Sequence, residues 1–174
     1  MFKVAELIFD NPNKIYHIRM LEKEIEFSTT AVIDAIKELK KFEIITIEET
    51  SLTTNVKANL ESEAYRFYKL VFNLYRLKRY GFVDKLIDIF NNPEAIVLFG
   101  SFSKGEDVEE SDIDILIISS NTDEDYLEET LDTFKKRLNR KINIHILHSL
   151  AKSSNEFKNA VANGIVLHGY IKVV

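Results

Sequence analysis

Residues 100–114 read Gly-Ser-Phe-Ser-Lys-Gly-Glu-Asp-Val-Glu-Glu-Ser-Asp-Ile-Asp, and no other stretch of the chain indicates a chemistry as strongly. An apolar segment, 95–99, precedes the Gly-Ser pair, and a second apolar segment, 115–118, follows the Asp-Ile-Asp triplet. Both segments are predicted to be strands. Gly100 permits a sharp turn and a close approach of the backbone to a phosphate, and Ser101 adds a hydroxyl and exposed N–H groups. The layout is suited to binding a nucleoside triphosphate.

The two aspartates at the start of the second strand form the other half of this pattern. Side chains alternate along a strand, so Asp112 and Asp114 are expected to project from one face while Ile113 points to the core. Two carboxylates this close repel each other unless a proton or a metal lies between them. Oxygen ligands of this kind suit Mg²⁺, which also takes oxygens from substrate phosphates.

Each half of the pattern has an ordinary structural explanation. A Gly-Ser pair alone is a common turn, and Asp-x-Asp alone is often a solvated strand end. In the order strand, Gly-Ser, basic residue and Gly, then Asp-x-Asp, they favour a functional site. Over residues 94–169 the chain resembles the DNA polymerase β-like nucleotidyltransferase superfamily, in particular its minimal branch. The signature is present as 100–105 and 111–114, with Lys104 where the family often has Arg.

The resemblance implies transfer of a nucleotidyl group from an NTP, with ATP expected, to a hydroxyl acceptor, dependent on Mg²⁺ or Mn²⁺. Gly100, Ser101 and Lys104 would bind the nucleotide, and Asp112 and Asp114 would be the catalytic metal ligands. The resemblance also implies that the acceptor could be a partner protein. Related antitoxins adenylylate a toxin of the HEPN ribonuclease type.

The family carries a third carboxylate on a later strand, for which the candidate is segment 141–147. Asn143 aligns with that carboxylate, and His145 is its neighbour on the same face. An Asn carbonyl can ligate Mg²⁺ but cannot act as a general base, whereas His145 could accept a proton. A lone His on a strand is more often a surface residue. A second interpretation therefore stays open: a nucleotide-sensing or DNA-binding regulator whose catalytic domain has decayed.

Composition limits the cellular setting. The 174 residues are 45% hydrophobic and include no cysteine, which removes disulfides, thiol catalysis and Cys-based zinc sites. No apolar run reaches the roughly 18 residues of a membrane span, and the first residues lack the form of a secretion signal. We therefore expect a cytoplasmic protein with no membrane partner.

Upstream of the motif, the sequence predicts a winged helix-turn-helix domain over residues 1–60. Helical spacing over 3–9, 16–26 and 31–41 is followed by an alternating segment at 45–48, a turn at 53–55 and a second strand at 56–60. It resembles the winged-helix domains fused to archaeal minimal nucleotidyltransferases. Residues 1–60 hold 8 basic and 10 acidic side chains, so DNA binding is weakly supported and a role in protein contacts is as well supported.

Residues 61–92 are predicted to be a helical linker, in which aromatic and basic residues interleave. Such a helix could stack on single-stranded nucleic acid, but aromatics at helical spacing more often form a core or an interface, for example in a homodimer. Residues 93–174 complete the minimal nucleotidyltransferase domain, with helices at 123–139 and 152–163, Gly164 as a C-cap and a last strand at 165–169. The fold class is thus α/β (α+β), with a C-terminal mixed sheet flanked by helices.

Overall fold

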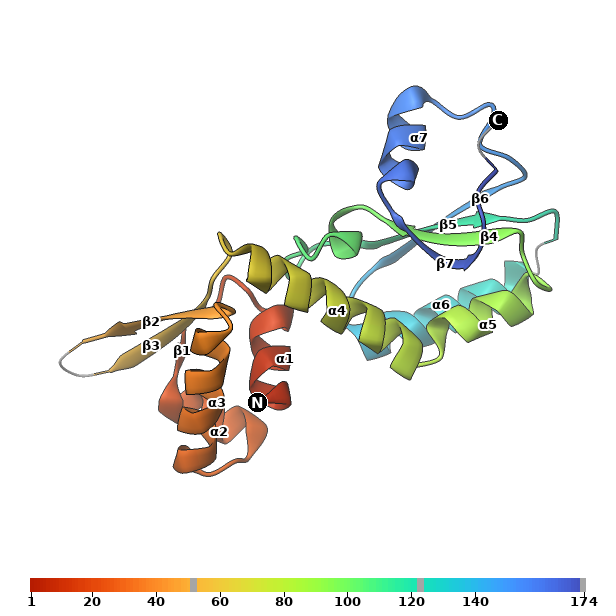
Figure 1. Cartoon of the computed structure of the whole chain (residues 1–174). Helices are drawn as coiled ribbons and strands as arrows, with labels where there is room; N and C mark the ends of the chain where they lie inside the picture. Colours follow the sequence, from red (N-terminus) through yellow and green to blue (C-terminus); the bar gives the residue numbers. More distant parts are fainter. Residues whose placement is uncertain (51–52, 122–123, 173–174) are drawn as a thin grey trace. The chain divides into compact units, whose positions relative to one another are not determined.

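The computed structural model describes residues 1–50, 53–121 and 124–172 (Figure 1). The chain divides into two compact units, residues 1–72 and 73–174. Helix α4 (Glu63–Arg79) begins in the first unit and ends in the second. Among the described residues, no helix combines the length and the apolar character that a bilayer crossing requires.

The first unit combines helices with a small antiparallel sheet whose strand order is β1-β3-β2. Its core gathers apolar side chains from α1, α3 and the start of α4, such as Ile8, Leu39 and Tyr65. The elements, in chain order, are α1 (Phe2–Asp10), β1 (Tyr16–His17), α2 (Ile18–Ile25), α3 (Thr29–Lys41), β2 (Ile45–Glu49) and β3 (Thr54–Ala58). Ser28 caps α3, because its Oγ accepts a hydrogen bond from the backbone N–H of Ala31.

Two local predictions in this unit were wrong. The helix predicted over 16–26 begins only at Ile18, because Tyr16 pairs with Val56 of β3 and its hydroxyl donates to the carbonyl of Leu7 at 2.9 Å. The turn predicted at 53–55 overlaps β3, which already begins at Thr54. Residues 51 and 52 lie outside the described part.

The second unit is built on a four-stranded mixed sheet of order β6-β5-β4-β7. Strands β5 and β6 are parallel, and the other neighbours are antiparallel. Helix α6 makes the crossover between the two parallel strands. The elements after α4 are α5 (Phe82–Ile89), β4 (Ala95–Phe99), the 3₁₀ turn η1 (Ser101–Ser103), β5 (Ile113–Ile118), α6 (Glu124–Leu138), β6 (Ile142–Leu147), α7 (Asn155–Ala162) and β7 (Ile165–Gly169). Residue 123, which belongs to the predicted helix 123–139, lies outside the described part.

Strand alternation separates the sheet into two faces with different coverings. Ile113, Ile115 and Ile117 of β5 pack in a cluster with side chains of α5 and α6. Leu116 and Ile118 belong to a second cluster, which includes Val161 of α7. Figure 1 shows α5 and α6 on one side of this sheet and α7 on the other. Asp112 and Asp114 have the parity of the face that carries α7.

The prediction for the C-terminal helix also needs correction. Helix α7 begins at Asn155, three residues later than expected, because Ser154 caps it by accepting from the N–H of Phe157. Its C-cap is Asn163, and the φ of Gly164 is not in the left-handed region. Glycine is required at 164 for a different reason: a Cβ there would lie 2.5 Å from the carbonyl oxygen of Leu98. Gly164 therefore permits the close approach of the chain to β4.

Candidate active site

The Gly-Ser pair lies where β4 ends beside the start of β5. All five residues of β4 are buried, and the last of them, Phe99, pairs with Asp114 across the antiparallel ladder. Gly100 then adopts φ +76° and ψ −163°. A Cβ on Gly100 would lie 2.5 Å from Oδ2 of Asp114, which is inside the van der Waals limit. The glycine is thus what allows the backbone turn and the carboxylate to lie next to each other.

The turn that follows is closed by its own hydrogen bonds. The carbonyl oxygen of Ser101 accepts from the N–H groups of Lys104 at 3.0 Å and Glu106 at 3.1 Å, and Ser103 Oγ donates to the carbonyl of Gly100 at 2.7 Å. Ser103 is buried, whereas Ser101 is partly exposed and Lys104 is exposed. The turn is therefore rigid on its inner side and presents Ser101 and Lys104 outward.

A buried asparagine from α4 holds the same turn from behind. Asn73 Nδ2 donates to the carbonyl of Phe102 at 3.0 Å and to Oδ1 of Asp107 at 2.8 Å. Both Asn73 and Asp107 are 2% exposed. Hydrogen bonds to a charged, buried acceptor are worth about 1.5–3 kcal/mol each and fix geometry closely. Asn73 therefore fixes the position of the Gly-Ser turn relative to α4.

The two aspartates lie next to Asn143 where the paired strands β5 and β6 begin. Asp114 is paired with Asn143 in the parallel ladder. Asn143 Nδ2 donates to Oδ2 of Asp112 at 3.1 Å and to Oδ1 of Asp114 at 3.0 Å. The amide therefore bridges two carboxylates that would otherwise repel each other. The two carboxylates and Asn143 are all at least partly open to solvent.

This donor set fits a divalent cation that takes its remaining ligands from water or from a substrate. Within residues 1–50, 53–121 and 124–172, no group of three His, Cys, Asp or Glu side chains is placed to hold a metal. Two carboxylates with a rotatable amide match what Mg²⁺ takes from proteins, since it usually completes its shell with water and phosphate oxygens. Turning the Asn143 amide over would present its carbonyl oxygen in place of its N–H groups.

His145 lies two residues further along the same face of β6, in an aromatic cluster. Its ring centroid is 5.5 Å from that of Phe99 and 5.3 Å from that of Phe157 on α7. Such separations are typical of stacked or tilted aromatic contacts. His145 is exposed, and it packs against the rings of Phe99 and Phe157.

The structure thus brings together most of the residues that the sequence singled out. Gly100, Asp112, Asp114 and Asn143 form one cluster, with Ser101 on the adjoining turn, while Lys104 is exposed beyond η1. The supporting role of Asn73 was missed. The signal available was a polar amide within the apolar run 70–74 of a predicted helix, where a buried side chain needs a partner.

Comparison with known proteins identifies the second unit. The family model described as "Polymerase beta, Nucleotidyltransferase" matches residues 84–170. No curated protein matches the chain.

Among solved structures, a toxin–antitoxin crystallised with AMP-PNP is similar at 25% identity and a TM-score of 0.41, over 51% of this chain and 71% of that chain. Two mutants of the MntA–HpeT toxin–antitoxin are similar at 23% identity, with TM-scores of 0.42 and 0.39. They cover 51% and 53% of this chain and 71% and 72% of theirs. The assignment rests on the family model, which spans half of the sequence and includes the Gly-Ser turn and both aspartates: the chain belongs to the polymerase β nucleotidyltransferase family.

Proposed function

We propose that the protein transfers a nucleotidyl group from ATP to a hydroxyl acceptor, with Mg²⁺ or Mn²⁺ as the cofactor. The observation that carries the proposal is the cluster of Asp112 and Asp114 against the Gly100 turn, where β4 ends and β5 begins. In the reaction, the acceptor oxygen forms a bond to the α-phosphorus, the bond from that phosphorus to the bridging oxygen breaks, and pyrophosphate leaves. The acceptor proton passes to a base or to water.

Each residue of the cluster has a role in this proposal. Asp112 and Asp114 would hold the cation, which when bound neutralises charge on the phosphates and on the attacking and leaving oxygens. Ser101 and the backbone of the Gly100 turn would bind the terminal phosphates, and Lys104 would approach them as an additional positive charge. The buried hydrogen bonds of Asn73 keep the turn in place while the substrate binds.

The proposed acceptor is a hydroxyl of a partner protein, as the family resemblance implies for a toxin of the HEPN type. The experiment that tests the proposed function incubates the full chain with each labelled nucleoside triphosphate, Mg²⁺ or Mn²⁺, and the product of a neighbouring gene. Label on the partner that disappears in chelator supports the proposal. Absence of label on any acceptor, together with absence of metal-dependent nucleotide binding, would contradict it.

Replacing Asn143 by aspartate is expected to raise the transfer rate about a hundredfold, the lower end of the roughly 10²–10⁴-fold that general-base assistance is worth. The change restores an anionic base and adds charge for the cation. It also replaces the amide that bridges the carboxylates of Asp112 and Asp114, so in chelator the variant should unfold at a lower temperature than the wild type. Added Mg²⁺ should then raise its unfolding temperature by more than it raises that of the wild type.

Asn155→Asp, on the exposed start of α7, is the matched control and should change neither the transfer rate nor the effect of Mg²⁺ on the unfolding temperature. His145→Ala should slow the wild type only if His145 supplies the base. If the wild type is already fast, and neither Asn143→Asp nor His145→Ala alters its rate, then the base lies elsewhere and Asn143 does not occupy the third-carboxylate position.

A second candidate function is a nucleotide-binding or DNA-binding regulator without turnover. The observation that favours it is Asn143, which donates hydrogen bonds to both carboxylates and cannot act as a general base. A nucleotide-binding regulator and the transferase predict the same metal-dependent nucleotide binding. They differ in whether label reaches an acceptor.

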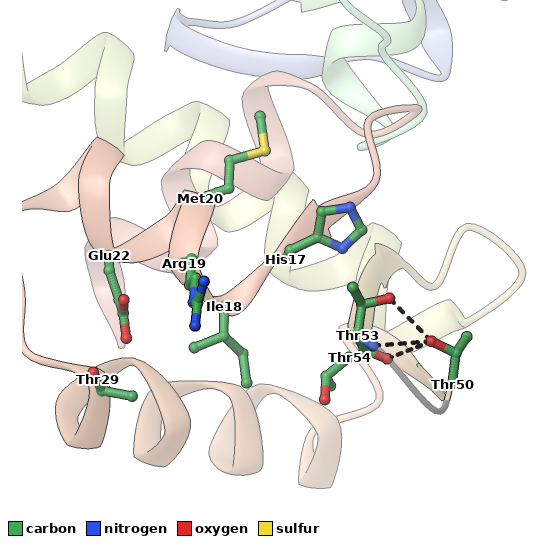
Figure 2. Close-up of a pocket in the computed structure, with 9 residues that line it drawn as sticks. All are labelled: His17, Ile18, Arg19, Met20, Glu22, Thr29, Thr50, Thr53 and Thr54. Carbon is green, nitrogen blue, oxygen red and sulfur yellow. Dashed lines mark hydrogen bonds between the residues drawn. The ribbon is translucent and has the colours of Figure 1, made fainter.

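We also propose that residues 1–60 form a winged helix-turn-helix domain, with 61–92 as the connecting helical region and 93–174 as the nucleotidyltransferase domain. The order of helices and strands and the β2–β3 hairpin support the winged-helix assignment. A cleft of about 910 Å³ opens between α2, the start of α3 and the β2–β3 end (Figure 2). Its lining combines polar and apolar side chains, and His17, Arg19, Thr29 and Thr53 are among those labelled.

If this domain contacts duplex DNA, binding by the full chain should be weak and steeply dependent on salt, because residues 1–60 are net acidic. Arg19→Ala should then weaken binding about equally for all sequences and reduce the salt slope by about one. The measurement is a fluorescence-anisotropy titration at several salt concentrations. Tight, sequence-specific binding at physiological salt would contradict this prediction and favour the regulator.

A further inference from the structure

Helix α4 has an exposed face whose composition is unusual for a solvated surface. The three exposed residues in its middle are Phe67, Val71 and Tyr75, with 60%, 47% and 45% of their surface accessible. The opposite face of α4 is buried and includes Tyr65, Phe72 and Leu77. An amphipathic helix normally presents polar side chains to water. We call the apolar row Phe67, Val71 and Tyr75 the α4 stripe.

Charged residues continue the α4 stripe at the same spacing in both directions. Glu63 precedes Phe67 by four residues, and Arg79 follows Tyr75 by four residues, and both are exposed. The Arg79 guanidinium carbon lies 5.8 Å from the centroid of the Tyr75 ring. The positions follow one i, i+4 row of a single uninterrupted helix, so their relative placement is set by helix geometry alone.

The row from Glu63 to Arg79 is complementary, in charge and in side-chain size, to a second copy of the same row that runs in the opposite direction. A two-fold axis through Val71 would set Phe67 of one copy against Tyr75 of the other and Glu63 of one against Arg79 of the other. Rows at i±4 pack against like rows with the helix axes inclined at about −50°, the commonest class of helix packing. In an isologous pair each contact occurs twice, which brings the acid of each copy to the base of the other.

We propose that the α4 stripe is a homodimer interface in which two copies of this chain pack antiparallel about Val71. The occupant is a second copy because the order acid, aromatic, aliphatic, aromatic, base matches its own reverse in charge and size. Because only three apolar side chains contribute from each copy, we expect a dissociation constant that is roughly micromolar rather than nanomolar. The proposal does not depend on the proposed function.

Sedimentation equilibrium of the full chain over a wide concentration range tests the proposal. The wild type should reach a monomer–dimer equilibrium. Val71→Asp places two like charges at the two-fold axis and should abolish dimerisation, and Phe67→Ala with Tyr75→Ala should weaken it by at least roughly tenfold. Since all three side chains are exposed, the thermal unfolding of these variants should stay close to that of the wild type.

Charge reversal identifies the partner as a second copy. Glu63→Arg alone or Arg79→Glu alone should weaken dimerisation by roughly tenfold, because each places like charges together twice. A mixture of the two variants should dimerise as well as the wild type, since every pair in the mixed dimer is again opposite in sign. Lys136→Glu, on the exposed face of α6, is the matched control and should have no effect.

A wild type that remains monomeric at hundreds of micromolar would overturn the proposal. So would dimerisation that survives Val71→Asp, or single charge reversals whose mixture fails to restore association. In the first case the α4 stripe would be assigned to a partner of different sequence. Binding of such a partner to the wild type, lost in Val71→Asp, would establish that assignment.

Discussion

Replacing Asp112 and Asp114 together by asparagine is expected to abolish metal-dependent nucleotide binding and to lower the rate of transfer roughly a thousandfold or more. In the proposed function these carboxylates and the phosphates share the cation, and charge neutralisation by a metal is worth several kcal/mol in the transition state, roughly three powers of ten. Calorimetric titration with ATP, with and without Mg²⁺, measures the affinity for the nucleotide. Transfer of a labelled nucleotidyl group to the acceptor measures the rate.

Stability separates loss of the metal site from loss of the fold in this experiment. The double variant removes two neighbouring negative charges, so in chelator it should be at least as stable as the wild type. Asp132→Asn is the matched control, because Asp132 is exposed on α6, where Lys135 Nζ lies 3.1 Å from its Oδ1. Equal affinity of the wild type for ATP with and without Mg²⁺ would count decisively against the site as drawn.

Gly100→Ala is expected to lower transfer by roughly a hundredfold or more and to destabilise the protein by about 1–3 kcal/mol. Two effects combine at this position. The backbone has φ +76°, which an L side chain rarely adopts, and the new Cβ would lie 2.5 Å from Oδ2 of Asp114. Either the turn or the carboxylate must move, and a displacement of about 1 Å in a catalytic constellation can cost about a hundredfold in rate.

Gly81 supplies a control with a positive φ but no collision. Its φ of +72° and ψ of 22° lie in the left-handed helical region, whereas the ψ of −163° places Gly100 in a region essentially restricted to glycine. A Cβ added to Gly81 would meet nothing within 4 Å. Gly81→Ala should therefore destabilise the protein by the strain alone and leave transfer unchanged. Chemical denaturation and the transfer assay are run on both variants. If Gly100→Ala costs no more stability than Gly81→Ala and retains full activity, the contact between Gly100 and Asp114 has no functional role.

The local elements were largely predictable because their signals lie within a few residues of each other. The breaks at Gly81 and at 91–93, the buried strand 95–99 and the parity of Asp112 and Asp114 all follow from spacing and turn chemistry. The prediction of a helix from residue 16 failed because Tyr16 pairs with Val56, which lies forty residues later in the chain. Local propensity contains no information about a strand partner so far away in sequence.

The sequence by itself determined the family-specific motif, the order of the C-terminal strands and helices, and the candidate residues Gly100, Asp112 and Asp114. Only the tertiary structure showed that Asn143 bridges both carboxylates and that Asn73 holds the Gly-Ser turn. It also showed which face of α4 is exposed. The physical reason is that a motif or a periodicity depends on residues close in sequence. These contacts depend instead on strand register and on packing between segments 29 to 34 residues apart.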